Sequence, residues 1–210
     1  MSKREENKGK KQTAILAAAL TVFSQKGYAA SKIIDIARAA NVGKGTIYEY
    51  HRSKEDLFFA LFQWYVERIG GEAAAQPMEG NAEERLRLFF SATLSAFYEE
   101  IDTFGVFLEF WAAAGNPATR DRFRSAMLSM YDQFRTLVAD LVDEGRATGI
   151  FTKDTDAVSV AAGLVGAMDG MMLQAWMDRK FDLLTVSEHF LDTLISGMTP
   201  HDQRKPIHDN

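Results

Sequence analysis

Residues 33–50 read IIDIARAANVGKGTIYEY, and this stretch decides the fold of the amino-terminal part of the chain. Ile33, Ile36 and Ala37 recur at helical spacing. Ala40-Asn41-Val42-Gly43 then predicts a tight turn, because Asn and Gly tolerate a positive φ. A second short helix is expected from Lys44 to about His51. A short helix, a tight turn and another short helix are the order of a helix-turn-helix.

The side chains of this stretch divide into two groups. One group is small and apolar and lets two short helices cross closely: Ile33, Ile36, Ala37, Val42 and Ile47. The other lies on the second helix and is free to face the major groove of DNA: Lys44, Thr46, Tyr48, Glu49 and Tyr50. A polar helix of this length buries too little to be stable alone, so its exposure indicates a function.

Outward from this motif, apolar periodicity is helical and no segment alternates as a strand does, so the fold class is all-α, with about nine helices. The first helix carries Ile15 and Phe23 and should stop at Gly27, and Ser31 is expected to cap the next helix. Ser53-Lys54-Glu55-Asp56 resembles a capping box. It opens the first of six longer helices, expected over 54–69 and broken by Gly70-Gly71 and the stretch to Asn81. The other five are expected over 82–100, 104–114, 118–147, 154–178 and 183–195.

We therefore expect residues 1–53 to be a DNA-binding domain with a basic amino-terminal arm. Residues 54–199 would form a helical domain for ligand binding and dimerisation, and residues 200–210 a disordered tail.

Composition excludes several classes of protein. The chain has no cysteine, which excludes disulfides and thiolate metal sites. The histidines at 51, 189, 201 and 208 lack metal-ligand spacing, and no phosphate loop or nucleophile elbow occurs, so no cofactor, metal or enzymatic activity is expected. No apolar run approaches the roughly 18 residues that cross a bilayer, and the start, MSKREENKGKKQ, is no signal peptide. A cytoplasmic protein without a membrane partner is expected.

Charge is unevenly distributed along the chain. Residues 1–57 carry eleven basic and six acidic side chains, a net charge of +5, whereas the remainder carries −10. A basic head can neutralise phosphates while an acidic body keeps the protein off nonspecific sites. Five of the basic residues lie in the first twelve, so a merely solvated tail is an equal alternative for Lys3 to Lys11.

Residues 15–58 resemble the TetR family of bacterial repressors. The matching features follow one another in the order of that family's pattern: Phe23, Lys26-Gly27-Tyr28, Ser31, Ile36-Ala37, Ala40-Asn41-Val42, Gly45-Thr46-Ile47-Tyr48 and Lys54-Glu55-Asp56-Leu57. So many constraints over about 44 residues make the match specific. Three positions depart from the pattern: Asn41 stands in place of Gly, Gly43 in place of Ser, and His51 in place of a Phe that packs beneath the recognition helix. We expect His51 to be partly buried and hydrogen-bonded, with a pH or ligand role as the alternative.

The resemblance implies roles for individual residues at DNA. It implies groove contacts for Lys44, Thr46 and Tyr50, and phosphate contacts for Ser31, Tyr48 and Lys54. For Tyr48 the alternative is core packing, and for Lys54 an ordinary place in a first helical turn. The whole set expected at the DNA is Ser31, Lys32, Lys44, Gly45, Thr46, Tyr48, Tyr50, His51 and Lys54.

Aromatic and methionine side chains gather on the middle helices, where the family encloses its ligand. An ordinary apolar core is the alternative for each of them. Asp169, Glu109 and Gln174 are candidate polar anchors, and the ligand should be mostly apolar; the resemblance is loosely to members that respond to long-chain acyl thioesters. The expected ligand-binding residues are Phe97, Phe104, Phe107, Phe110, Trp111, Met127, Met130, Tyr131, Phe134, Met168, Asp169, Met172 and Trp176.

The last two helices resemble the dimerisation hairpin of the family. Small residues would allow close approach and larger ones would fill the interface, with intramolecular packing as the alternative: Ala162, Gly166, Phe190, Leu194 and Ile195. A homodimer would match palindromic double-stranded operator DNA.

The sequence thus predicts a DNA-binding regulator, a repressor released from its operator by an apolar small molecule. A transcriptional activator of the same fold is an alternative. A helical lipid- or drug-binding module without DNA binding is another, although it would leave the exposed groove-facing helix unexplained.

Overall fold

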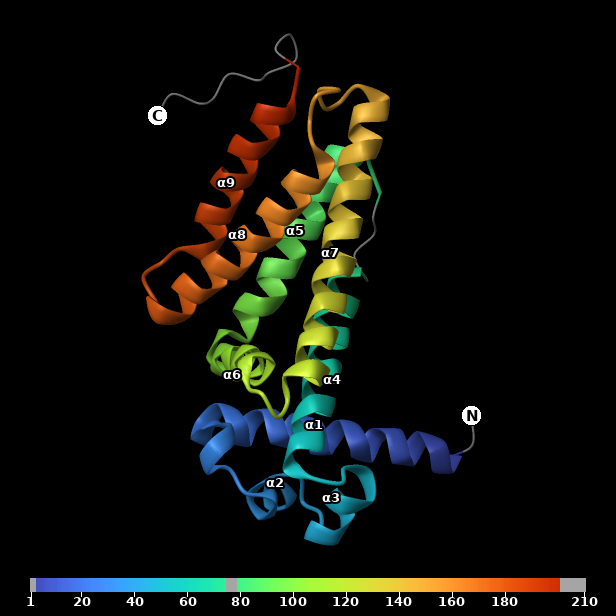
Figure 1. Cartoon of the computed structure of the whole chain (residues 1–210), viewed down its shortest axis with the longest axis vertical. Coiled ribbons are helices and arrows are strands. Elements are labelled where there is room, and N and C mark those ends of the chain that lie inside the picture. Colours follow the sequence, from blue (N-terminus) through green and yellow to red (C-terminus); the bar gives the residue numbers. More distant parts are fainter. Residues whose placement is uncertain (1–2, 75–78, 201–210) are drawn as a thin grey trace. The chain divides into compact units, whose positions relative to one another are not determined.

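The computed structural model describes residues 3–74 and 79–200, and within them all regular structure is helical, as Figure 1 shows. The all-α prediction is confirmed. One short 3-10 turn, Ile101–Thr103, accompanies nine α-helices in this part of the chain. These are α1 Lys3–Ala30, α2 Ile33–Ala39, α3 Lys44–Tyr50, α4 Lys54–Ala74, α5 Ala82–Glu99, α6 Phe104–Gly115, α7 Arg120–Thr148, α8 Ala157–Met177 and α9 Leu183–Met198.

Most helix ends fall within three residues of their predicted positions, but two predictions about ends are wrong. Gly70-Gly71 does not end α4, which continues to Ala74. A glycine costs a helix only about 1 kcal/mol relative to alanine, so two of them weaken a helix without breaking it. Ser31 does not cap α2, whose N-cap is Lys32. Ser53 does cap α4, since its hydroxyl accepts the amide of Asp56 at 3.0 Å.

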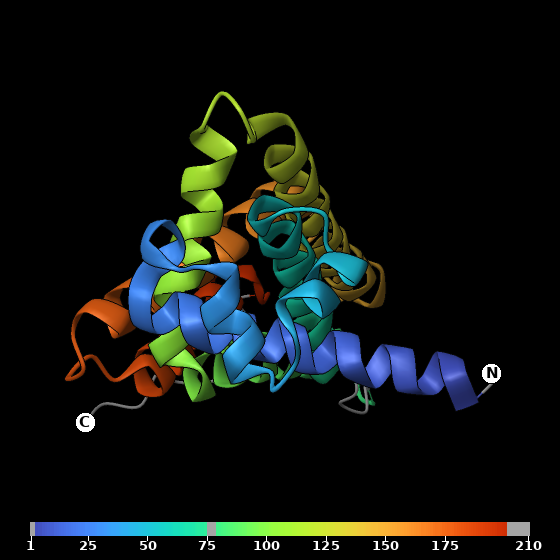
Figure 2. The same cartoon turned by 90° about the horizontal axis from the view of Figure 1, so that it is seen from below.

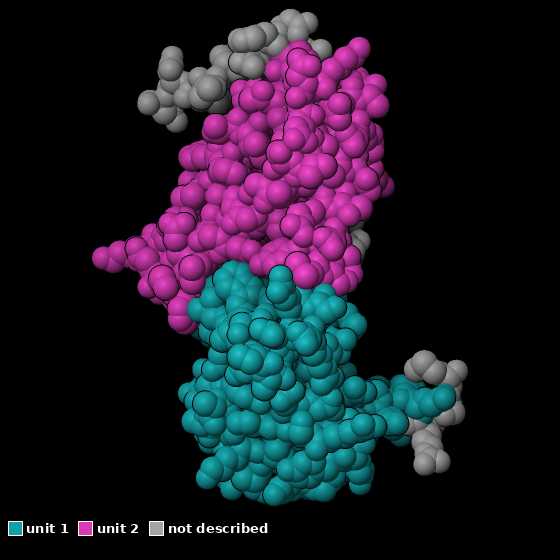
Figure 3. Space-filling view, viewed as in Figure 1, with its two compact units in different colours: residues 1–68, 102–127 teal, residues 69–101, 128–210 magenta. Residues whose placement is uncertain are grey.

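The chain forms two compact units (Figure 3). Unit 1 comprises residues 1–68 and 102–127, and unit 2 comprises residues 69–101 and 128–210. Unit 1 therefore holds α1, α2, α3, most of α4, α6 and the start of α7. The predicted boundary after residue 53 separates DNA binding from ligand binding and dimerisation, whereas these units are defined by packing. The functional boundary therefore stays a prediction. The predicted tail, 200–210, lies outside the described residues except for Pro200.

Phenylalanine rings form the core of unit 1. Phe58 of α4 lies with its ring centroid 4.6 Å from that of Phe110 of α6, 5.3 Å from Phe23 of α1 and 5.7 Å from Phe123 of α7. All four side chains are at most 2% exposed. One cluster thus ties together four helices that are far apart in the sequence.

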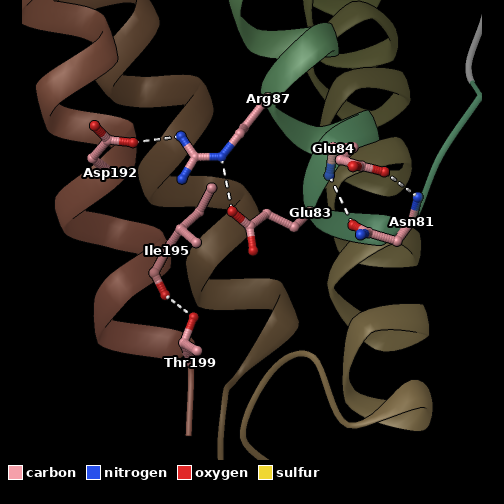
Figure 4. Close-up of polar contacts among 7 residues, drawn as sticks. All are labelled: Asn81, Glu83, Glu84, Arg87, Asp192, Ile195 and Thr199. Atoms are coloured by element: carbon pink, nitrogen blue, oxygen red, sulfur yellow. Dashed lines mark hydrogen bonds and ion pairs between the residues drawn. The ribbon is translucent and has the colours of Figure 1, made fainter. Parts of the chain in front are cut away.

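Unit 2 is organised around α5, which packs against α8 and α9. Its buried face carries Leu86, Phe90 and Leu94, and the Phe90 ring lies 6.2 Å from that of Phe190 on α9. Arg87 adds polar contacts at the edge, donating to Glu83 at 2.9 Å and to Asp192 at 2.5 Å, as Figure 4 shows.

Helix α8 changes one conclusion drawn from the sequence. It is long enough and apolar enough to cross a membrane by length and composition, with a mean hydropathy of 1.3 over its best window. The expectation that no such segment exists is therefore wrong. Such a helix is weak support for a membrane span, because the core helix of a soluble protein has the same composition, and Leu164, Met168 and Met172 of α8 are buried inside unit 2.

We predict that Gly145→Ala destabilises the protein. Gly145 is inside α7, where alanine would ordinarily add up to about 1 kcal/mol of helix stability. A Cβ at this position would overlap the ring of Phe151, which is 1% exposed and bonded through its amide to the Gly145 carbonyl at 3.0 Å. Overpacking of this kind costs about 2 kcal/mol. Urea unfolding measures the change; Gly9→Ala, where a Cβ meets open space, is the control and should not destabilise.

Candidate nucleic-acid interface and ligand-binding residues

Helices α2 and α3 form the predicted helix-turn-helix. Asn41 adopts a φ of 53°, as its place in the turn requires, and the Val42 amide donates to the Ala37 carbonyl at 2.9 Å. Ile36 and Ile47 are fully buried where the two helices cross. The turn and the apolar contacts are therefore as predicted, and they fix α3 on α2.

The outer face of α3 is open to solvent. Lys44, Gly45 and Glu49 are exposed, Tyr48 is 46% exposed, and the Lys44 ammonium lies 5.8 Å from the centre of the Tyr48 ring. Thr46 and Tyr50 are half-buried, and Lys32, before α2, is exposed. The exposure of Tyr48 goes against the alternative that it is core. This face can present a cation, hydroxyls and an aromatic ring to a groove.

Two residues expected at phosphates have partners inside the protein instead. Ser31 is 2% exposed, and its hydroxyl donates to the Gly27 carbonyl at 2.6 Å. The Lys54 ammonium donates to the carbonyls of Tyr28 at 2.7 Å, Ser31 at 3.1 Å and Ala29 at 3.3 Å. Three acceptors use all three of its protons. We therefore leave both side chains out of the DNA-contacting set that we propose below.

Two exposed arginines near α3 escaped the sequence analysis. Arg38 lies in the last turn of α2, and Arg52 directly follows the His51 cap of α3. Both belong to the basic excess of residues 1–57, which could have drawn attention to them. Their positions suit contacts to phosphates on either side of a bound helix.

The basic arm is helical rather than a loose tail. Every residue from Glu5 to Ala14 belongs to α1 and is exposed, and Figure 2 shows this part of α1 running out from the rest of unit 1 on the side where α3 lies. Lys10 is paired with Glu6 at 2.6 Å. Lys8 and Lys11 lie in register with the buried Ile15 and Val22, on the other side of the helix from that pair.

His51 caps α3 and is buried, with 3% exposure. Its Nε2 atom has no hydrogen-bond partner among the described residues, so the expectation of a partly buried, hydrogen-bonded histidine is right about burial only. Burial lowers the pKa of His51 below 6.5, although the nearby Asp56 carboxylate opposes this. Burial therefore favours the neutral ring, which is packed inside unit 1 at the end of α3.

Comparison with known proteins decides the family. Residues 15–61 match the model of bacterial regulatory proteins of the tetR family, and residues 82–196 match that of the BetI-type transcriptional repressor C-terminal domain. The chain belongs to the TetR family. The fatty acid metabolism regulator protein of Bacillus subtilis is 25% identical over 199 residues, which are 92% of this chain and 98% of that protein.

Solved structures agree with this assignment. A TetR regulator from Haloarcula marismortui superposes with a TM-score of 0.81 at 22% identity, over 91% of this chain and 100% of that one. FadR of Bacillus subtilis, crystallised in complex with stearoyl-CoA, gives a TM-score of 0.68 at 25% identity, over 89% and 98%. As a TetR-family protein, this chain is a DNA-binding transcriptional regulator and not an enzyme.

The expected ligand-binding residues of this regulator are divided between the two units. Unit 1 contains Phe104, Phe107, Phe110, Trp111 and Met127. Trp111 is half-buried and its ring lies 5.7 Å from that of Phe107, whereas Phe110 is fully buried in the phenylalanine cluster. Phe110 has the contacts of a core residue, which is the alternative that the sequence left open.

Unit 2 contains the remaining expected residues: Phe97, Met130, Tyr131, Phe134, Met168, Asp169, Met172 and Trp176. Asp169 of α8 is half-buried and accepts a hydrogen bond from the Tyr131 hydroxyl of α7 at 2.7 Å. Burial raises the pKa of Asp169, and the Tyr131 hydrogen bond opposes the rise. The two other candidate anchors are engaged elsewhere, since Glu109 accepts the Tyr28 amide and exposed Gln174 donates to the Gly170 carbonyl.

The expected dimerisation residues also divide, here by exposure. Ala162 and Gly166 lie on an exposed face of α8, whereas Ile195 is 3% exposed inside unit 2, and Phe190 and Leu194 are half-buried. The sequence analysis did not single out the large apolar side chains that are exposed on α8 and α9. These are Val158 at 73%, Met177 at 70%, Leu184 at 45% and Val186 at 39%.

We predict that His51→Phe stabilises the protein, by about 1 kcal/mol at neutral pH, because it removes a buried nitrogen without a partner. The folded pKa lies below the unfolded value near 6.5, so the unfolded chain binds the proton first as pH falls. The wild-type protein should therefore lose stability as pH falls through 6.5 toward the lowered folded pKa, and His51→Phe should lose less.

Urea unfolding at pH 7.5 and 5.5, at one protein concentration, tests this. The exposed His189→Gln is the control. An unchanged pH dependence in His51→Phe would show that His51 is not the titrating group.

Proposed function

We propose that this TetR-family regulator is a homodimeric repressor that leaves a palindromic operator when a mostly apolar ligand binds. The observation that carries the proposal is the open face of α3, with Lys44 and Tyr48 exposed while Ile47 on the opposite face is fully buried. A short helix that is held by its buried face and presents a cation, hydroxyls and an aromatic ring on the other is suited to contact a DNA groove.

The DNA-contacting set that we propose comprises Lys32, Lys44, Gly45, Thr46, Tyr48 and Tyr50. Lys44, Thr46 and Tyr50 face base edges, and the Tyr48 hydroxyl binds a phosphate. We add Arg38 and Arg52 as phosphate contacts because both are exposed beside this face. His51 supports α3 from beneath.

The ligand that we propose is an acyl compound, in keeping with the loose resemblance of the sequence. A relative named as a fatty acid metabolism regulator and the stearoyl-CoA complex of FadR support this class. Within unit 2, the buried Met130, Met168 and Met172 are flexible apolar side chains on α7 and α8, the two helices that the Tyr131–Asp169 pair joins. This pair is the polar anchor of the ligand. Its acidic member, Asp169, favours a neutral group such as a thioester carbonyl over a free carboxylate.

The dimer interface that we propose is the exposed face of α8 with the adjoining part of α9. Ala162, Gly163 and Gly166 allow helices to approach closely, and Val158 and Met177 lie toward the two ends of α8. Apolar side chains this exposed are stabilised when a second copy covers them. The two-fold symmetry of such a dimer matches a palindrome. A DNA-binding protein of this kind acts in the cytoplasm.

We predict that Lys44→Ala and Tyr48→Ala each weaken binding to a specific duplex about 10- to 100-fold, because each removes a direct contact worth 1–3 kcal/mol. The DNA is the intergenic segment upstream of the gene, and a scrambled duplex of equal length measures nonspecific binding. Fluorescence anisotropy over a salt series gives both affinities.

Lys153→Ala, on an exposed loop of unit 2, is the charge-matched control and should change neither affinity. Stearoyl-CoA is then added to the protein–operator complex and should release it. If a selection from random duplexes yields no sequence that the wild-type protein prefers, the proposed DNA-binding function is wrong.

We predict that Val158→Asp converts the dimer to monomers, raising its dissociation constant at least 100-fold, because a charge on a covered apolar surface must be desolvated. Sedimentation equilibrium measures the change. Leu128→Asp places the same charge on a 48% exposed leucine of α7 and should leave the dimer intact. Equal behaviour of the two variants would place the interface elsewhere.

A further inference from the structure

Helix α1 contains a break that frees backbone groups. At Gly27 φ is 75° and ψ is 159°, so the helix cannot continue, and Tyr28 to Ala30 form a separate last turn. The amide of Tyr28 and the carbonyls that follow thereby lose helical partners. Ala29 and Ala30 are exposed, whereas the Tyr28 ring lies 4.4 Å from that of Phe58 and Ser31 is 2% exposed. Packing therefore holds the segment at Tyr28 and Ser31, and its backbone groups still need partners.

Side chains from two other helices satisfy these groups. Both carboxylate oxygens of Glu109, in α6, accept the Tyr28 amide at 2.9 Å. From α4, the Lys54 ammonium donates to the carbonyls of Tyr28, Ala29 and Ser31 and lies 4.3 Å from the centre of the Tyr28 ring. The pKa of Tyr28 is raised, first by burial and then by the carboxylates of Glu55 and Glu109. The donors and the acceptors of the break are thus held by different helices.

The same segment is joined to the helix-turn-helix. Lys26, just before the break, pairs with Asp35 of α2 at 3.2 Å, and this pairing lowers the pKa of Asp35. Asp35 also accepts the amide of Lys32 at 3.3 Å. A displacement of residues 27–31 therefore acts on the first turn of α2, to which α3 is packed.

We propose that Glu109 and Lys54 form a two-point latch on residues 27–31, through which α6 and α4 set the orientation of the helix-turn-helix. Glu109 is then a positioning residue for operator binding, although it touches no DNA. Because α4 and α6 hold different backbone groups of one short segment, a movement of either helix acts on that segment. The latch rests on the proposed function and deepens it, because it names the contacts through which a movement of α6 reaches the recognition helix α3.

The difference between a latch and a local cap is measurable. Glu109→Ala removes both acceptors of the Tyr28 amide, and Glu83→Ala, which removes one negative charge from α5, is the matched control. Hydrogen–deuterium exchange of the free protein is followed separately for residues 28–31 and for α2. Operator and scrambled-duplex affinities are measured in parallel, with urea unfolding to report global stability.

If the latch exists, the backbone amides of both segments exchange faster in Glu109→Ala than in the wild type, and the variant binds the operator at least 10-fold more weakly. Its affinity for the scrambled duplex stays within threefold of the wild-type value. Glu109→Gln keeps one acceptor and should fall between wild type and Glu109→Ala; it replaces Glu109→Ala if that variant does not fold. If exchange rises at 28–31 alone and operator affinity stays within twofold, Glu109 is only a local cap and the proposal is overturned.

A double-mutant cycle tests whether the two contacts act together. Lys54→Met removes the second point. If both residues act through one segment, the fold-loss of operator affinity in the double variant is smaller than the product of the fold-losses in the two single variants. Independent losses contradict the latch. Should the wild-type protein bind no specific duplex, the proposed function fails, and exchange in α2 alone decides whether the latch exists.

Discussion

The packing of Phe58 against Phe23, Phe110 and Phe123 is the constraint on which unit 1 depends. Each ring comes from a different helix, and burying one such side chain stabilises the fold by about 1.5–3 kcal/mol. Because this cluster fixes α1, α4, α6 and α7 together, the short helices α2 and α3 need supply little stability of their own. The DNA-facing helix can then be polar and exposed at no risk to the fold.

Polar contacts determine the orientation of the helix-turn-helix, which the aromatic cluster alone does not fix. The cluster sets how far apart the helices lie, but a ring contact is tolerant of small rotations. Hydrogen bonds have narrower geometry, and those of Glu109 and Lys54 act on the backbone at the break of α1. The orientation of the helix-turn-helix therefore depends on a few polar atoms, although its stability depends on the rings.

Local periodicity was sufficient to predict the fold class, the helix-turn-helix, its turn at Asn41 and most helix ends, because these depend on residues near one another in the chain. It could not show contacts between residues that are distant in the chain. Glu109 was expected at a ligand, and its partner Tyr28 is 81 residues away. Lys54 was expected at a phosphate, whereas it lies against carbonyls some 25 residues earlier. Val158 fits a helical apolar stripe, and only the fold shows that it points away from the core.

There is a physical reason why the sequence does not show these contacts. A charged side chain in a sequence indicates that a partner is needed, but water, DNA and an unpaired backbone group all serve equally well. The broken last turn of α1 supplies such backbone groups, and Gly27 was visible in the sequence as a helix stop. What the sequence could not show is that the stop lies inside a compact unit, within reach of α4 and α6. The partly buried helix end finds donors and acceptors in those helices, which couples DNA recognition to the elements that supply them.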